Sequence, residues 1–269
     1  MARVIGLVAY HVFKESVRDK VLYNLVLFAI LLIAASYLIG QMTAGQDVKI
    51  IKDLGLAASS VFGLFMAVFI GVGLVWKEVD RRSVYNLLVK PIRRHEFIIG
   101  KFLGLAGTLL VNLAVMAAAL YVVLALMAWR QPALVKASVD APVLDPGLLV
   151  AFVLLYVQLL VVTSVAICFS TFSSPMLSAA FTVGLYVVGH FNADLAHFEH
   201  VVDSPAAAWL AKALYYLLPN LAPFDVKMAV VHGQAVPALF VLFTAGYGVL
   251  YAAAMITLAA LIFSRRDFK

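Results

Sequence analysis

Histidine and acidic side chains gather in one polar stretch of the sequence, where metal or acid–base chemistry would first be sought. His190, Asp194, His197, Glu199 and His200 fall within eleven residues. His197 and His200 are three residues apart, so on a helix both could reach one metal ion. The same spacing arises often by chance, and surface histidines usually only form hydrogen bonds. The sequence therefore favours a stretch without a metal site.

The sequence contains no recognisable motif for catalysis or nucleotide binding. A phosphate loop needs Gly-x-x-x-x-Gly-Lys-Ser/Thr, but Gly100-Lys101 has His95 in place of the first glycine and Phe102 at the last position. His95-Glu96 is not a zinc-protease pair, because position 99 is isoleucine rather than histidine. Gly-x-Ser-x-Gly is also absent. We therefore expect no catalytic residues, and no cofactor or metal bound by this chain.

Residues 77–101 form a charged segment between two apolar runs. Apolar side chains recur in it at helical spacing, at Val84, Leu87 and Leu88, until Pro91 ends the pattern. A short helix with an apolar stripe and flanking charges suits docking into a groove on a soluble partner. A solvated loop whose basic residues only set membrane topology would explain the same pattern equally well.

This segment resembles the first cytoplasmic loop of type-2 ABC exporter permeases. That family has an acidic residue, a Leu-Leu pair, a Pro-x-x-Arg-x-Glu segment and a Gly-Lys pair before the third span. The corresponding residues are Glu78, Leu87-Leu88, Pro91 with Arg94 and Glu96, and Gly100-Lys101. Residues 215–221, Tyr-Tyr-Leu-Leu-Pro-Asn-Leu, are similar to members associated with multicopper-enzyme maturation. None of these motifs identifies the cargo.

The resemblance implies the transmembrane permease subunit of an ATP-driven exporter. Residues 82–90 would be a coupling helix that docks on a separate ABC ATPase subunit, two copies of which would bind ATP and Mg²⁺. Further implied partners are a second permease copy or a homologous permease, membrane lipid, and a periplasmic or accessory component, but no nucleic acid. The alternative is a six-span transporter or scaffold that is not driven by ATP. The residues expected at the ATPase contact are Glu78, Arg81, Arg82, Val84, Leu87, Leu88, Pro91, Arg93, Arg94 and Glu96.

The overall composition is that of a membrane protein. Apolar residues make up 65% of the chain and charged residues 13%, with a mean hydropathy of +1.03. Soluble domains average about 45–50% apolar and about 25% charged residues. Such a chain has too little polar surface for water, so the net charge of +6 indicates membrane topology rather than nucleic-acid binding.

Long charge-free runs locate the expected spans of a single all-α transmembrane domain, residues 1–269. The runs are continuous rather than alternating, which favours helices over barrel strands. The run between Asp145 and Asp194 is long enough for two helices, with a break at Ser173-Ser174-Pro175. The expected spans are 21–40, 54–76, 102–128, 147–171, 176–192 and 239–263.

Two amphipathic segments flank these spans. Residues 2–18 carry a polar stripe at His11, Lys14, Glu15 and Arg18, which predicts an interfacial helix before the first span. The alternative is a simple extension of the first span. Residues 204–218 predict a short extracytoplasmic helix before the sixth span, too short to cross the bilayer.

The distribution of basic residues sets the expected orientation. Residues 1–20, the loop 77–101 and the C-terminal tail together hold fourteen Lys and Arg, whereas the other connections hold six. Because the richer side is usually cytoplasmic, both termini are expected inside. With the family resemblance, this places the chain in the cytoplasmic membrane of a prokaryote.

The expected spans contain no Asp, Glu, Lys or Arg, which argues against an ion-coupled transporter. Neutral polar residues are expected to form hydrogen bonds between helices. Gly100-x-x-x-Gly104 either allows close helix approach or only relaxes the start of the third span, and the sequence does not separate these two roles. The neutral polar residues are Asn24, Ser59, Ser60, Asn112, Gln158, Thr163 and Thr182.

Overall fold

A computed structural model describes residues 2–42, 47–80, 93–130, 143–191, 209, 212, 213, 215 and 218–265, without the side chains of Ala2, Asp47 and residues 74–80. Within these residues there are helices and no strands. Five helices are long and apolar enough to cross a membrane. The predicted fold class, an all-α polytopic membrane protein, is therefore confirmed, while the number of six spans stays a prediction.

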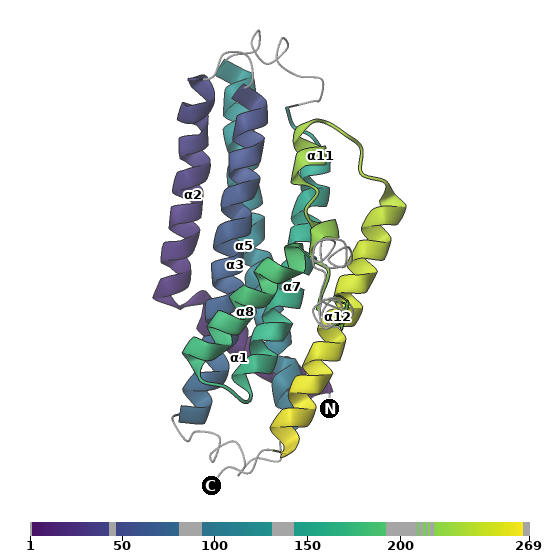
Figure 1. Cartoon of the computed structure of the whole chain (residues 1–269). Coiled ribbons are helices and arrows are strands. Elements are labelled where there is room, and N and C mark those ends of the chain that lie inside the picture. The colour runs from purple at the N-terminus through teal and green to yellow at the C-terminus, as the bar shows by residue number, and fades with distance from the viewer. Residues whose placement is uncertain are drawn as a thin grey trace.

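The five long helices run up and down one elongated bundle (Figure 1). Helices α2, α3 and α5 pack against one another, and α12 runs obliquely along the other side. The N-terminus and the last turn of α12 lie at the same end of the bundle, which we call the α1 end (Figure 1). The bounds of the long helices are Lys20–Gln41 for α2, Asp47–Asp80 for α3, Arg94–Arg130 for α5, Gly147–Ser170 for α7 and Ala238–Arg265 for α12.

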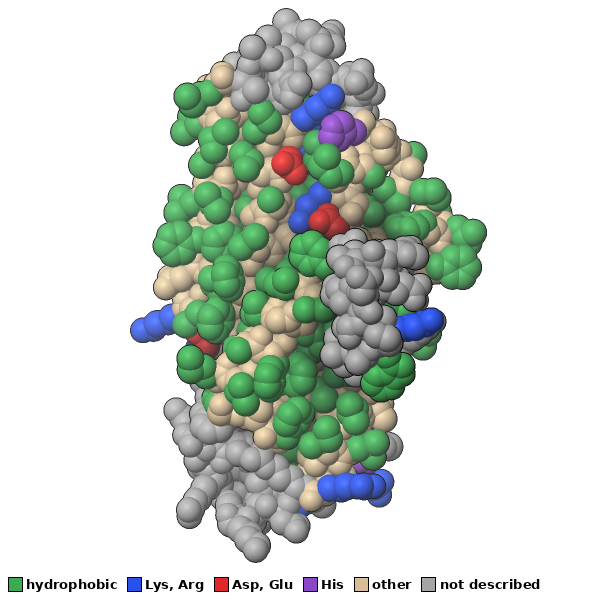
Figure 2. Space-filling model, in the orientation of Figure 1, with side chains coloured by type: hydrophobic (Ala, Val, Ile, Leu, Met, Phe, Trp, Pro, Cys, Tyr) green, Lys and Arg blue, Asp and Glu red, His purple; other side chains and the backbone are tan. Residues whose placement is uncertain are grey.

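Helix α7 forms the centre of the bundle. It packs against α3, α5, α8 and α12. In the most apolar stretch of α7, 72% of the residues are buried. The corresponding share is 22% in both α2 and α12, so these two helices lie at the edges of the bundle. Edge side chains such as Phe28 and Leu32 are exposed, and hydrophobic side chains are spread along the described face of the bundle in Figure 2. Lipid is the solvent that suits such a surface.

Helix α3 approaches α7 closely because small residues recur at every fourth position along it. A Cβ at Gly63 would lie 2.7 Å from Leu159 Cδ1, and one at Gly71 would lie 2.8 Å from Ala166 Cβ. Small side chains at this spacing let two helix backbones pack tightly in a membrane. The stripe consists of Gly55, Ser59, Gly63, Ala67 and Gly71, and at Gly55 the neighbour is Leu120 of α5 rather than α7.

Helix α8, Pro175–His190, is shorter than the others. Its 16 residues follow a break at Ser173-Ser174, with Ser174 at the N-cap and Pro175 in the first turn. Sixteen residues rise about 24 Å, less than the ~30 Å of a hydrocarbon core. The 3-10 helix η2, Ala222–Phe224, and the short helix α11, Lys227–Val231, follow. The expected outer helix 204–218 falls almost wholly outside the described residues.

Two helices extend beyond the spans expected from the sequence. Helix α3 begins at Asp47 rather than near residue 54, so Lys52 and Asp53 lie within it. Helix α5 is continuous from Arg94 to Arg130, so it begins well before the expected span 102–128. Hydropathy marks the part of a helix that is apolar, whereas a helix ends only where its backbone hydrogen bonding is interrupted.

Candidate coupling site at the start of α5

The first turn of α5 is closed by its own glutamate. The backbone N–H of Arg93 donates to Glu96 Oε2 at 3.2 Å. This is the return half of a capping box, in which a glutamate three residues into the helix satisfies the N-cap amide. Glu96 is buried. The beginning of α5, directly after the predicted coupling segment, therefore has a defined local structure.

Arg94 joins this first turn to the last turn of α12. Its Nη1 donates to the carbonyl oxygens of Phe263, at 3.3 Å, and Ser264, at 3.0 Å. The last carbonyls of a helix have no partner within the helix and carry partial negative charge. A guanidinium at this position satisfies two of them and links two helices that are far apart in the sequence.

An apolar cluster lies beneath this contact. The rings of Phe97 and Phe263 stack with their centroids 6.0 Å apart. Lys101 is fully buried, with Nζ 4.5 Å from the centroid of the Phe97 ring. The cluster therefore connects α1, α5, α7 and α12 at the α1 end. Its buried members are Val12, Phe97, Ile98, Leu105, Ile167, Cys168, Ile256, Ala259, Ala260 and Phe263.

Helix α1, Ala2–Val17, is a separate helix rather than an extension of α2. Asp19 lies between them in an extended conformation, and its Oδ1 accepts the N–H of Val21 at 2.9 Å. Asp19 is therefore the N-cap of α2, and α2 begins as a new helix after it. His11 and Lys14 on the expected polar stripe are exposed, and Val12 on the opposite side is buried. The interfacial location of α1 stays a prediction.

The apolar side of α1 lies directly on two glycines of α5. A Cβ at Gly104 would lie 2.6 Å from the carbonyl oxygen of Ala9, and a Cβ at Gly100 would lie 2.7 Å from Val8 Cβ. Only a residue without a side chain fits at such distances. Of the two roles considered for Gly100-x-x-x-Gly104, close helix approach is therefore correct, and the partner is α1.

The structure describes the side chains of three of the predicted ATPase-contact residues, and these three lie together. Arg93, Arg94 and Glu96 form the hydrogen-bonded first turn of α5. Glu78 falls in the last turn of α3, but its side chain is not described. The contact itself stays a prediction. The expected contact residues outside the described part of the chain are Arg81, Arg82, Val84, Leu87, Leu88 and Pro91, and His197 and His200 also lie outside it.

Among the neutral polar residues, Gln158 makes the expected bond between helices. Its Nε2 donates to His190 Nε2, at 2.9 Å, and His190 Nδ1 donates to the carbonyl of Tyr186, at 2.8 Å. Because the glutamine nitrogen can only donate, this arrangement requires a neutral imidazole with its proton on Nδ1. Ser59, Thr163 and Thr182 instead bond to carbonyls of their own helices, four residues back.

A buried ion pair at the opposite end of the bundle was missed by the sequence analysis. Lys52 Nζ of α3 lies 3.6 Å from Asp145 Oδ2, and the two side chains are 1% and 15% exposed. Asp145 Oδ1 accepts the N–H of Gly147 at 2.8 Å, and Tyr121 donates its hydroxyl to the Asp145 carbonyl at 2.9 Å.

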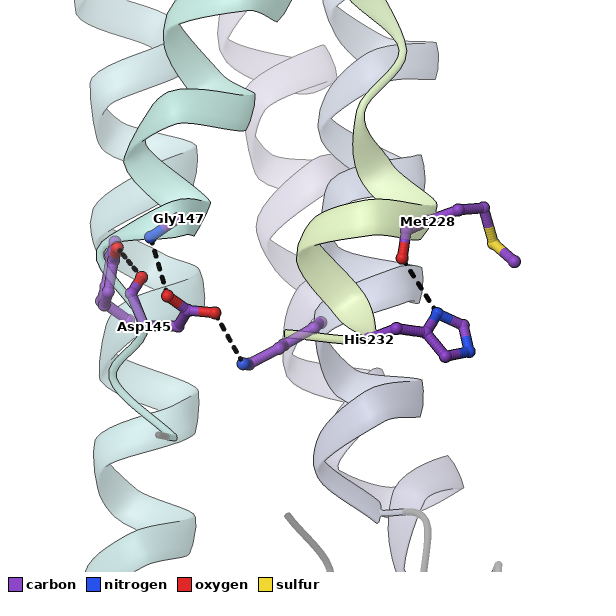
Figure 3. A network of polar contacts seen from close by, with 6 residues as sticks. Asp145, Gly147, Met228 and His232 are labelled. Carbon is purple, nitrogen blue, oxygen red and sulfur yellow. Dashed lines mark hydrogen bonds and ion pairs between the residues drawn. The ribbon is translucent and has the colours of Figure 1, made fainter. Parts of the chain in front are cut away.

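Figure 3 shows Asp145 and Gly147 at the start of α7, near Met228 and His232 of the α11 region. His232 is the C-cap residue of α11, and its Nδ1 donates to the carbonyl of Met228 at 2.9 Å. Lys52 and Asp145 flank the charge-free runs, so the sequence analysis assigned both to connections. Opposite charges at the ends of neighbouring spans were the signal that could have predicted the pair.

The comparisons with known proteins agree with this architecture. A family model described as ABC-2 family transporter protein matches residues 7–268, nearly the whole chain. No curated protein matches the chain. The matched region includes all five long apolar helices, the start of α5 and the loop before it. The chain therefore belongs to the ABC-2 family of transporter proteins, as a multi-pass membrane component of an ABC transporter.

Proposed function

We propose that this chain is the permease subunit of an ABC exporter, and that residues 82–90 dock on a separate ATPase subunit. The observation that carries the proposal is the anchoring of α5. Arg94, the first residue of α5 after the loop, is hydrogen-bonded to the last turn of α12. A force applied to the loop would therefore reach α12 and α1 as well as α5.

The proposed mechanism is alternating access driven from the loop. The two ATPase subunits bind ATP and Mg²⁺, and their closure moves the coupling segment. Arg94 holds the end of α12, and Gly104 holds α1 against α5, so these three helices would tilt as one body. Cargo affinity must differ between the inward-facing and outward-facing states for this cycle to move cargo in one direction.

The proposed assembly contains two permeases, either two copies of this chain or one copy with a homologous permease. Each would contribute helices to the translocation path. We place the α1 end in the cytoplasm of a prokaryotic cell, at the cytoplasmic membrane. The count of fourteen basic residues against six supports this orientation.

Copurification tests the proposal. The full chain is isolated from its native membrane in mild detergent, and its partners are identified by mass spectrometry. We expect an ATPase subunit with a phosphate loop, ATP hydrolysis by the complex, and none by the chain alone, because its sequence lacks that motif. Saturable hydrolysis by the pure chain would contradict the need for a separate ATPase subunit. Transport by a preparation without any ATPase would favour the ATP-independent alternative.

A further inference from the structure

An apolar groove lies between the first part of α5 and the second half of α12. Its volume is ≈ 550 Å³, within the range of about 300–1,000 Å³ that is typical of small-molecule sites. Alanines make the α12 wall hollow. The residues that line it are His95, Ile99, Phe102 and Leu103 of α5, Leu160 of α7, and Val249, Ala252, Ala253, Ile256, Thr257, Ala260, Leu261 and Ser264 of α12.

The groove has the length of a lipid tail and opens outward. From Val249 to Ser264 the helix rises about 22 Å, whereas one leaflet contributes about 15 Å of hydrocarbon. Leu103, Val249 and Leu261 in its wall are 48%, 55% and 55% exposed. The groove is therefore open at the bundle surface and covers the depth of the leaflet at the α1 end.

Basic side chains lie at one end of this groove. His95 and Ser264 line the end nearest the α1 end. The Arg94 guanidinium is bonded to the Ser264 carbonyl, and Arg265 follows it as an exposed residue. No aspartate or glutamate occurs among the lining residues. An amphiphile with one anionic end and one long apolar part matches this distribution.

We propose that the groove binds one anionic phospholipid from the leaflet at the α1 end. An acyl chain lies between α5 and α12, and the phosphate lies beside His95 and Arg94. Basic pockets between transmembrane helices are a recognised means of holding anionic headgroups. The bound lipid would stabilise the contact between α5 and α12. The proposal does not depend on the identity of the ATPase or of the cargo.

Native mass spectrometry of the delipidated full chain tests this site. The probes are phosphatidylglycerol and phosphatidylcholine with identical acyl chains. Ala253→Trp fills the groove, and its matched control is Ala254→Trp, the neighbouring exposed residue outside the lining. Arg94→Gln removes the charge bonded to Ser264 at the end of the groove, and Arg93→Gln is its control at the neighbouring exposed basic residue.

We expect tighter binding of phosphatidylglycerol than of phosphatidylcholine, and loss of that binding in Ala253→Trp but not in Ala254→Trp. Arg94→Gln should weaken phosphatidylglycerol binding about fivefold, which corresponds to one basic residue near an anionic surface, and Arg93→Gln should not. A photoactivatable phosphatidylglycerol should label residues 95–103 or 249–264 in the unmodified chain, a measurement that needs no variant.

Four results would overturn the proposal. Equal binding of the two lipids would show that charge has no part in recognition. Equal binding by Ala253→Trp and Ala254→Trp, or labelling outside both 95–103 and 249–264, would show that the lipid does not occupy the groove. A change in the dimer fraction of Ala253→Trp with lipid binding intact would identify the groove as a protein interface.

Discussion

Arg94 links two parts of the chain that the sequence separates by about 170 positions. Its hydrogen bonds reach Phe263 and Ser264 at the end of α12. The family pattern marks Arg94 as a characteristic residue of the loop, but no local pattern could name its partner. Sequence spacing predicts contacts within one helix, whereas this contact depends on how two helices pack.

Arg94→Gln should lower the stability of the purified chain. The change removes charge-assisted hydrogen bonds to two helix-terminal carbonyls, and such bonds contribute about 1–2 kcal/mol at a half-exposed site. The measurement is thermal unfolding in detergent. Arg93→Gln is the matched control, since Arg93 is exposed and uses its backbone N–H in the cap. Equal unfolding temperatures for the two variants would contradict the structural role of Arg94.

The Lys52–Asp145 pair gives a second prediction for single residues. Lys52→Leu leaves Asp145 without its ionic partner in a largely buried site, and should destabilise the chain by about 1–3 kcal/mol. Lys52→Leu with Asp145→Leu should recover part of that loss, because no charge then remains buried at this site. A double-mutant cycle measured by thermal unfolding checks this, and strictly additive single effects would show that the two side chains are not coupled.

At the scale of helices, charge-free runs predicted where apolar helices occur but not where those helices end. Helix α3 includes Lys49, Lys52 and Asp53, because charged side chains do not interrupt a helical backbone. Its first described residue is therefore Asp47 rather than residue 54. The Gly100-x-x-x-Gly104 pattern indicated a possible close contact, and the structure identifies α1 as its partner. That assignment needs the three-dimensional packing, since a glycine pattern does not specify which helix will lie on it.

Gly104→Val should detach α1 from α5. Even its Cβ would lie 2.6 Å from the Ala9 carbonyl oxygen, so the helices must separate, at a cost of about 1–3 kcal/mol. Hydrogen exchange should become faster across the amides of α1. Gly73→Val is the control, because a Cβ there has nothing within 4 Å. Unchanged protection of α1 in Gly104→Val would mean that α1 does not depend on this contact.

At the scale of the whole molecule, the sequence predicted a membrane bundle but not the arrangement of its helices. Composition and run length were enough for the fold class, because a chain this apolar must lie in lipid. Every span is strongly apolar, however, so hydropathy could not reveal that α7 is central while α2 and α12 are peripheral. The small residues of α3 were the available signal, and they indicate which face packs inward.

The orientation of the bundle gives a prediction for intact cells. Ser83→Cys and Ala141→Cys are each made in a Cys168→Ala background, which removes the single native cysteine. An impermeant thiol reagent should label position 141 and leave position 83 protected until the cells are opened. The basis is the charge count of fourteen against six. Labelling of 83 with protection of 141 would place the α1 end outside the cell.

The central proposal is that residues 82–90 dock on the ATPase subunit, and Leu87→Asp tests it most directly. If the stripe of Val84, Leu87 and Leu88 is buried in a groove, losing one leucine removes about 1.5–3 kcal/mol. A buried unpaired carboxylate would cost several kcal/mol more. Since each 1.4 kcal/mol is tenfold in affinity, docking should weaken by roughly a thousandfold or more.

The measurement is pull-down of the ATPase subunit by the full chain, with membrane abundance as the reference. Asn86→Asp is the matched control, because it adds the same charge one position away, on the opposite side of a helix from the apolar stripe. We predict that Leu87→Asp loses the ATPase at normal abundance while Asn86→Asp retains it. Normal pull-down by Leu87→Asp would contradict the coupling role of residues 82–90.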